Sequence, residues 1–301
     1  MKLNSKKIFI FTTNRADYGL LKRFIILCKK SKIIKPLLVV TGSHLQRKFG
    51  YTYKEIKDDN YIKQIKVFVK INGDRPEQLA SSMANNIKAI SKIFKKKTPD
   101  LIVVLGDRIE LIPICYTALL FNIPIVHFNG GELTEGLMDD AIRHSVSKLS
   151  HIHFVSNEIY KKRVIQMGEN PKKVFNIGGT SIDNIKNTKL LKKEQLEKKL
   201  SLQFDKKTFL VTYHPVTLDK KNSQNEINNL LNVLSNYKNN QIIITGTNID
   251  PNNNYIKKKI FKFCKRNSNV KYFESLGHTY YLSIMNICDL VVGNSSSGIL
   301  E

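Results

Sequence analysis

The chain has 301 residues, of which 42 % are hydrophobic and 25 % charged, and its formal net charge is +24 at pH 7. This length and apolar content allow two domains with sizeable cores, and no run of about 18 apolar residues could span a membrane. The positive charge does not predict a nucleic-acid function, because the lysines are spread over helices and loops without an RNA-binding fingerprint or interleaved aromatic residues.

The cysteines and the N-terminal residues indicate the cytoplasm. Cys28, Cys115, Cys264 and Cys288 lie far apart in apolar segments and form no CxxC pair, which favours reduced core thiols over disulfide or metal roles. Residues 1–7 are polar and lead directly into an apolar strand pattern, so they do not resemble a signal peptide. We therefore expect a cytoplasmic protein.

Short apolar runs alternate with helical patterns along the whole chain. Seven strands are predicted first, at Ile8–Thr12, Leu37–Thr41, Ile65–Lys70, Leu101–Leu105, Ile125–Phe128, Ile152–Val155 and Val174–Ile177. Four more are predicted at Phe209–Tyr213, Ile242–Thr245, Val270–Phe273 and Leu290–Val292. Helix-sized segments between them include Pro76–Phe94, Ile109–Phe121, Ala141–Leu149 and Glu226–Tyr237. Continuous apolar strands separated by helices predict an α/β fold with parallel sheets covered on both faces.

The stretch from Asp183 to Lys207 is charged and lysine-rich and contains no strand pattern. We interpret it as a linker between two doubly wound, Rossmann-like domains, residues 1–182 and residues 208–301. Ligands of such sheets bind beyond the carboxyl ends of the strands. Eight predicted strand ends carry polar or glycine-rich segments, at 13–19, 41–44, 106–108, 127–132, 178–183, 213–216, 245–247 and 293–298. This repetition predicts a ligand cleft between the two domains.

The last of these segments is typical of an anion-binding loop. A strand is followed by Gly293-Asn-Ser-Ser-Ser-Gly and then by the first residues of a helix, so backbone N–H groups and hydroxyls converge at a helix start. A plain loop is the alternative. Because Glu301 is the last residue, the helix is cut short, and we expect a C-terminally truncated second domain and a phosphorylated ligand.

Two further segments carry groups suited to acid–base chemistry. Asp139, Asp140, Arg143 and His144 open a helix, where they form either an acid–base surface or ordinary pairs four residues apart. The loop before this helix adds Glu132.

Asp107-Arg108 directly follows a buried strand, with a structural ion pair as the alternative interpretation. His214 follows a strand of the second domain, and an imidazole titrates close enough to neutrality to transfer protons. We interpret His151 and His153 as structural and His278 as a surface or cap residue.

Seven of these segments, taken in order, resemble the hydrolysing UDP-N-acetylglucosamine 2-epimerases of sialic acid biosynthesis. They are Asn14-Arg-Ala-Asp-Tyr, Thr41-Gly-Ser-His, Gly106-Asp-Arg, Gly130-Gly-Glu, Asp139-Asp-Ala-Ile-Arg-His, His214-Pro-Val and Gly293-Asn-Ser-Ser-Ser-Gly. The resemblance implies a glycosyltransferase-B-like fold and the conversion of UDP-GlcNAc and water to ManNAc and UDP, without metal or redox cofactor. It implies a UDP-sugar ligand, held mainly by the second domain, and we expect a homo-oligomer, a dimer or a tetramer.

The resemblance also implies roles for individual residues. The candidate catalytic residues are Asp107, Glu132, Asp139, Asp140, Arg143 and His214. The candidate substrate-binding residues are Arg15, Asp17, His44, Arg108, Gly293, Asn294, Ser295, Ser296 and Glu301. Some family members carry a catalytic glutamate where this chain has Asn129, and an amide cannot act as a base. Either Glu132 replaces it, or the roles are distributed differently.

Several functions stay open at this stage. The first predicted strand ends in Thr-Thr-Asn-Arg rather than in the G-x-G-x-x-G of dinucleotide sites, which favours proton removal at C2 over transient oxidation. Within the family, the substrate is either UDP-GlcNAc or UDP-2,4-diacetamido-2,4,6-trideoxy-glucose of the legionaminic acid route. Outside it, the alternatives are a glycosyltransferase and a non-catalytic UDP-sugar-binding protein of the same fold.

Overall fold

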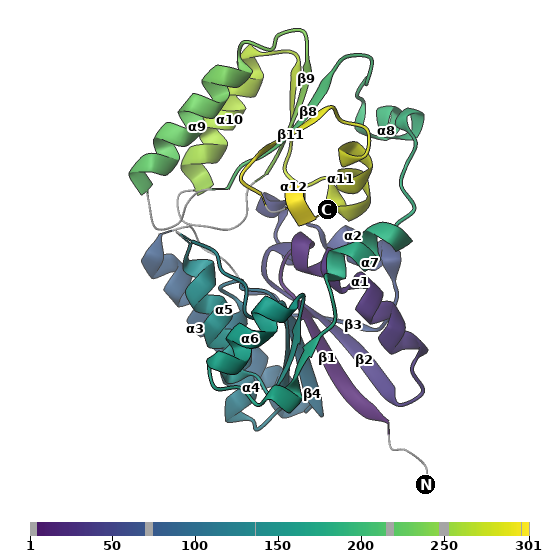
Figure 1. Ribbon diagram of the computed structural model, residues 1–301, viewed down its shortest axis with the longest axis vertical. Coiled ribbons are helices and arrows are strands. Elements are labelled where there is room, and N and C mark those ends of the chain that lie inside the picture. The colour runs from purple at the N-terminus through teal and green to yellow at the C-terminus, as the bar shows by residue number, and fades with distance from the viewer. Residues whose placement is uncertain are drawn as a thin grey trace. The chain divides into compact units, whose positions relative to one another are not determined.

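The structure is a computed structural model that describes residues 5–69, 75–135, 137–214, 220–246, 253–295 and 297–300. By its internal contacts the chain divides into two compact units, the first ending at Asn184 and the second starting at Ile185 (Figure 1). The stretch 183–207, predicted as a linker, therefore lies largely in the second unit. There Leu196, Leu202 and Phe204 are buried in the core, because apolar side chains at these positions pack against the sheet.

The first unit contains a parallel sheet whose strands run in the order β3-β2-β1-β4-β5-β6-β7. Their bounds are β1 (Lys6–Thr12), β2 (Ile34–Val40), β3 (Gln64–Lys66), β4 (Leu101–Leu105), β5 (Ile125–Phe128), β6 (Ile152–Val155) and β7 (Val174–Asn176). The α-helices of this unit are α1 (Arg15–Lys30), α2 (Tyr53–Asp59), α3 (Pro76–Lys96), α4 (Leu111–Leu120), α5 (Met138–Leu149), α6 (Glu158–Gln166) and α7 (Thr180–Asn187), which crosses the boundary. Three short 3₁₀ turns are η1 (Gly42–Leu45), η2 (Arg47–Phe49) and η3 (Pro171–Lys173).

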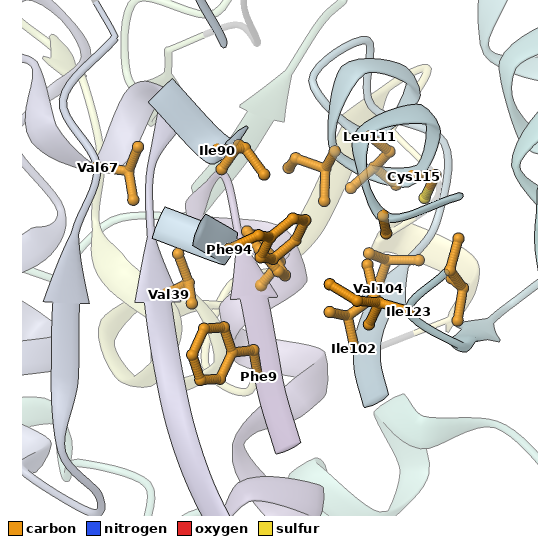
Figure 2. Packing of buried hydrophobic residues seen from close by; sticks show 14 of the residues in the cluster. Phe9, Val39, Val67, Ile90, Phe94, Ile102, Val104, Leu111, Cys115 and Ile123 are labelled. Carbon is orange, nitrogen blue, oxygen red and sulfur yellow. The ribbon is translucent and has the colours of Figure 1, made fainter. Parts of the chain in front are cut away.

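The strands are apolar on both faces because helices cover both sides of the sheet. Alternate residues of β1 point to opposite faces, so Phe9 and Phe11 join one core cluster and Ile10 joins another. Helices α3, α4 and α5 cover the first face, while α1 and α2 cover the second. Figure 2 shows Phe94 of α3 among the side chains of the first cluster. Burying each such side chain stabilises the fold by roughly 1.5–3 kcal/mol.

The second unit contains a parallel sheet in the order β10-β9-β8-β11. Its strands are β8 (Thr208–Thr212), β9 (Gln241–Thr245), β10 (Val270–Phe273) and β11 (Leu290–Gly293). Its helices are α8 (Lys193–Leu200), α9 (Lys220–Leu234), α10 (Asn253–Arg266), α11 (Gly277–Met285) and α12 (Ser297–Leu300). Helices α9 and α10 lie alongside each other and pack on one face of the sheet (Figure 1), while α8 and α11 pack on the other.

The predicted elements are present, with differences at their ends. The predicted strand Ile65–Lys70 is β3, which ends at Lys66 because its only neighbour in the sheet, β2, ends at Val40; Lys70 lies outside the described residues. Helix α5 begins at Met138, so Asp139 and Asp140 lie in its first turn. Among the described residues, no helix combines the length and the apolar character needed to cross a bilayer.

Candidate functional site

In the first unit, the predicted site residues follow the carboxyl ends of β1, β2, β4 and β5. Strands β1 and β4 are neighbours at the point where the strand order reverses, which is where doubly wound sheets bind ligands. Gly106 ends β4 with a φ of +84°, and its N–H donates to the carbonyl oxygen of Phe128 at 3.0 Å. This left-handed turn, which glycine adopts without strain, directs Asp107 and Arg108 away from the strand.

Arg143 of α5 is the centre of the charged cluster. Its side chain is almost fully buried, and one terminal nitrogen pairs with the carboxylate of Asp107. The other terminal nitrogen donates to the backbone oxygen of Glu132 at 3.0 Å. Arg143 thereby connects the loop after β4, the loop after β5 and α5, and it fixes the Asp107 carboxylate by a charge-assisted hydrogen bond.

Asp139 and Asp140 have different partners. The Asp139 carboxylate pairs with Arg108 at 2.7 Å rather than with Arg143, four residues along its own helix. Asp140 accepts from the Thr134 N–H at 2.9 Å and lies 3.7 Å from both Arg143 and His144. The cluster therefore contains both the ion pairs of the structural interpretation and a group of carboxylates around two guanidinium groups.

Glu132 is a largely buried carboxylate of this cluster, and its surroundings raise its pKa. Burial raises the pKa of Glu132 and the nearby Asp107 raises it further, against the opposing effects of Arg143 and of a hydrogen bond from Ser156. That hydrogen bond is long, at 3.4 Å. A carboxylate with a raised pKa binds a proton more readily than an ordinary glutamate, which suits it to accept a proton and to return it.

Asn129 has a structural role in the loop after β5. Its φ of +60° lies in the left-handed region, which asparagine tolerates better than most residues. Its N–H donates to the carbonyl oxygen of Phe154 at 2.8 Å, which continues the pairing between β5 and β6. The backbone then turns through Gly130 and Gly131 to place Glu132 beside Arg143.

His127 belongs to the polar strand-end segment 127–132, although it is not among the predicted site residues. It is fully buried in β5, with Nε2 at 2.8 Å from the Gly106 carbonyl oxygen and Nδ1 at 3.1 Å from the Ser147 hydroxyl. Burial lowers the pKa of His127 to about 4, so the ring is neutral near pH 7. Because a carbonyl can only accept, Nε2 carries the proton and Nδ1 accepts from Ser147. The available sequence signal was a polar residue within a buried strand.

A Cβ atom added to Gly130 would lie 2.7 Å from the Ser147 hydroxyl oxygen and 3.1 Å from Nδ1 of His127. The absence of a side chain at Gly130 therefore allows the glycine turn to pack against this histidine.

Asp17 and His44 are buried in a hydrogen-bond network of the first unit. Asp17 accepts from the backbone N–H and the hydroxyl of Thr13, at 2.8 and 2.7 Å, and from Thr12. The His44 ring lies 2.9 Å from the Thr12 hydroxyl and 2.7 Å from the Thr52 hydroxyl. This network holds the turn that carries Arg15 at the start of α1. Direct substrate binding by Asp17 or His44 stays a prediction.

In the second unit, His214 and Asn294 follow the adjacent strands β8 and β11. The Asn294 side chain accepts from the His214 N–H and donates to the His214 carbonyl oxygen, both at 2.8 Å. Gly293 has a φ of +137°, and a side chain there would collide with the Thr212 carbonyl oxygen. The predicted residues Gly293, Asn294 and Ser295 therefore form a loop locked to the end of β8, whereas Ser296 and Glu301 lie outside the described residues.

Local contacts show how the structure places His278 and His153. His278, expected at the surface or as a cap, is instead buried at the start of α11, because that helix packs against the sheet. His153 lies within the core at 3.2 Å from Glu169, as a structural residue would. Within the part of the chain that the structure describes, no group of three or more His, Cys, Asp or Glu side chains is arranged to hold a metal ion.

Comparisons with known proteins agree with this fold. The family model described as UDP-N-acetylglucosamine 2-epimerase matches residues 27–301. The chain is 44 % identical over 300 residues to the Campylobacter jejuni "GDP/UDP-N,N'-diacetylbacillosamine 2-epimerase (hydrolyzing)", an alignment that covers 99 % of this chain and 78 % of the relative. It is 32 % identical to the Neisseria meningitidis UDP-N-acetylglucosamine 2-epimerase, over 98 % of this chain and 76 % of that protein.

Among solved structures, the Methanocaldococcus jannaschii UDP-GlcNAc 2-epimerase in complex with UDP-GlcNAc and UDP matches with a TM-score of 0.77 and 18 % identity. The match covers 96 % of this chain and 79 % of that one. At this identity the likeness establishes the fold alone. The predicted α/β fold with Rossmann-like, glycosyltransferase-B-like units is therefore confirmed.

Proposed function

Because the chain belongs to the UDP-N-acetylglucosamine 2-epimerase family, we propose that it is a hydrolysing 2-epimerase of a UDP-linked 2-acetamido sugar. The observation that carries this proposal is the charged cluster of the first unit, in which carboxylates contact the guanidinium groups of Arg108 and Arg143. Removal of a proton from one carbon and departure of a group from its neighbour require acid and base groups held in fixed positions.

The proposed reaction has two balanced steps. A base takes the hydrogen from C2 as a proton, the electrons of that C–H bond form a C1=C2 double bond, and the C1–O bond breaks with its electrons leaving on UDP. Water then adds to the double bond, with its hydroxyl on C1 and a proton delivered to the opposite face of C2. One UDP-sugar and one water give UDP and the free sugar inverted at C2.

In this proposal the residues of the first unit perform the proton transfers. Glu132 is the best candidate for a proton-accepting group, because its pKa is raised and its backbone is fixed by Arg143. Asp107, held by Arg143, and Asp139, held by Arg108, supply the further carboxylates that the reaction needs. Asp140 supports the cluster by anchoring the loop that leads into α5.

The second unit supplies the groups for the nucleotide in the same proposal. Backbone N–H groups and hydroxyls of the loop at Gly293–Ser295 suit the diphosphate, and Ser296 and Glu301 are further predicted contacts from this unit. Arg15 and Arg108 are the nucleotide contacts predicted from the first unit. His214 follows the adjacent strand, where Asn294 holds its backbone, and an imidazole can protonate a departing or incoming group.

Two substrates are proposed, and one observation favours the second. UDP-GlcNAc is the substrate implied by the family resemblance. N,N'-diacetylbacillosamine is 2,4-diacetamido-2,4,6-trideoxyglucose, and the relative with 44 % identity is named for it. These sugars differ at C4 and C6. A role in making sialic-acid-type sugars and assembly into a homo-oligomer remain predictions that accompany this proposal.

The test is to incubate the purified protein with each UDP-sugar in heavy water and to measure UDP release and the released sugar. We expect UDP release without any acceptor sugar and one deuterium at C2 of the product. The substrate with the higher kcat/KM is the natural one. Turnover only with an acceptor would instead indicate a glycosyltransferase, and binding of UDP without turnover would indicate a binding protein. A product that keeps its original C2 hydrogen would rule out elimination.

A further inference from the structure

A continuous chain of hydroxyl groups runs through the second unit to the loop after β11. The Thr245 hydroxyl oxygen lies 2.7 Å from that of Thr212, which lies 3.3 Å from the Tyr281 hydroxyl oxygen. Tyr281 lies 2.6 Å from the Ser297 hydroxyl oxygen, which lies 2.9 Å from that of Ser295. Four contacts therefore link five hydroxyls from two strand ends, α11, α12 and the loop.

The inner part of this chain is in the core. Thr212, Thr245 and Tyr281 are all buried, with Tyr281 only 6 % exposed, whereas Ser295 and Ser297 are half-buried. Buried hydroxyls are costly unless they are hydrogen-bonded, and each hydroxyl here has a partner in the chain. Tyr281 is the member that connects the strand ends to the loop.

The number of hydroxyl protons determines whether the hydroxyl chain can donate a hydrogen bond to a ligand. Each hydroxyl has one proton to donate, so five hydroxyls joined by four contacts leave one proton for a partner at one end. Ser295 Oγ also accepts from the Ser297 N–H, at 3.4 Å. If each hydroxyl donates towards the loop, the remaining proton is that of Ser295. The preceding hydrogen bonds of the hydroxyl chain then polarise the Ser295 hydroxyl and make it a stronger donor.

We propose that Tyr281 is a positioning residue for nucleotide binding, which orients Ser297 and Ser295 so that the Ser295 hydroxyl donates to a phosphate oxygen. This inference rests on the proposed function, because it takes the diphosphate of UDP as the ligand of the loop. A chain of neutral donors suits an anion, since donation to a charged oxygen is stronger than donation to a neutral one. Tyr281 acts through the serines and does not itself contact the nucleotide.

The test is the Tyr281→Phe variant, which removes one hydroxyl and keeps the ring that packs in the core. Tyr280→Phe is the matched control, because Tyr280 is the neighbour on the same helix and lies outside the hydroxyl chain. Calorimetry should measure the affinities for UDP and for uridine. We expect Tyr281→Phe to bind UDP about five- to twentyfold more weakly, the usual effect of losing support for a charge-assisted hydrogen bond. Affinity for uridine, which has no phosphate, should not change.

Further variants separate positioning from general damage. Thr212→Val removes the hydroxyl that precedes Tyr281 in the hydroxyl chain, one step further from the loop. It should weaken UDP binding by a smaller factor than Tyr281→Phe and leave the affinity for uridine unchanged. Equal UDP affinities of Tyr281→Phe and Tyr280→Phe would overturn the inference, and so would equal losses for UDP and uridine in Tyr281→Phe. If the wild-type protein turns over UDP-sugar and Tyr281→Phe binds UDP as tightly as the wild type, only this inference is refuted. A wild-type protein that binds no UDP refutes the proposed function as well.

Discussion

The two units carry polar residues at the same place in their sheets, beyond the strands where the order reverses, but the residues differ in kind. In the first unit the contacts are ion pairs, with Arg143 on Asp107 and Arg108 on Asp139. In the second unit, the contacts beside the loop after β11 include neutral groups, namely the Asn294 amide on the His214 backbone and the hydroxyl chain through Tyr281. Charged side chains lie elsewhere at the strand ends of this unit, with Glu226 on Tyr213 and Lys257 on Glu274. Charged groups can exchange protons, whereas neutral donors can bind an anion without doing so. Under the proposed function, this difference corresponds to a division between acid–base chemistry in the first unit and anion binding in the loop after β11.

The strongest test of this division is Asp107→Asn. Removal of a positioned acid–base group typically lowers a rate by roughly 10²–10⁴-fold, so we expect kcat to fall by that factor while UDP affinity changes little. Steady-state kinetics and UDP titration check both parts. Asp58→Asn, at an exposed position of α2, serves as the control and should leave both values unchanged. A large loss of UDP affinity in Asp107→Asn would show that the division is wrong.

His214→Ala tests the candidate catalytic residue of the second unit. We expect its kcat to fall by a factor of the same order, roughly 10²–10⁴-fold, if the imidazole transfers a proton. UDP affinity should be largely kept, because Asn294 contacts the backbone of His214 and not its ring. If kcat is unaffected and UDP binding is lost, the second unit serves binding alone, and the division is complete.

Glu132→Gln asks whether Glu132 takes the role that Asn129 cannot perform. We expect kcat to fall by about 10²-fold, at the lower end of the usual effect of a general base. The base must be ionised to accept a proton, so the wild-type activity should fall as the pH is lowered through the pKa of Glu132. Because this pKa is raised, the fall should occur at a higher pH than for an ordinary glutamate. A pH–rate profile measures this. Near-full activity of Glu132→Gln would exclude Glu132 as the replacement.

The His127→Gln variant tests how the stability of the first unit, rather than its activity, depends on pH. The pKa of this histidine is about 4 in the folded protein and near 6.5 when unfolded, so the unfolded state binds the extra proton between these values. Stability should therefore fall as the pH drops from about 6.5 to about 4, by about 3 kcal/mol for this group. Urea unfolding at several pH values should show a weaker pH dependence for His127→Gln, but not for the exposed His151→Gln. Parallel curves for wild type and His127→Gln would contradict the buried, neutral assignment.

The smallest effect is expected from the double variant Ser295→Ala/Ser296→Ala. Loss of hydroxyl donors to a phosphate should weaken UDP binding by roughly 20- to 50-fold, at least as much as Tyr281→Phe, which acts through Ser295, with little effect on the acid–base steps. Calorimetric titration measures the affinity, with Ser268→Ala, at an exposed position, as the control. Unchanged affinity would remove the serines from the nucleotide site.

Much of the fold could be predicted because local pattern determines it. An apolar run as short as Ile8–Thr12, flanked by polar residues and followed by a helical pattern, favours a buried strand, and β1 covers these residues. The predicted catalytic residues Asp107, Glu132 and Asp139 come together for a related reason. Carboxyl ends of parallel strands lie on one edge of a sheet, so residues that follow them in sequence become neighbours.

Other features depended on contacts between distant segments. The residues predicted as a linker carry Leu196 and Phe204, which are isolated apolar residues in a lysine-rich sequence until the second sheet buries them. The pairing of Asp139 with Arg108 joins residues 31 positions apart, whereas the helical pattern favoured a partner four residues along. His278, predicted to be a surface or cap residue, is buried, because one turn of helix does not show which face another element will cover.

The sequence by itself determined the α/β class, the alternation of strands and helices, and the residue types at each strand end, since these depend on periodicity and on chain order. The tertiary structure decided the partner of each charged group, the neutral state of His127 and the hydroxyl chain through Tyr281. These properties depend on desolvation and on distances of a few ångströms between residues far apart in the chain. Local sequence does not encode such distances, because they arise only when the sheets and helices pack together.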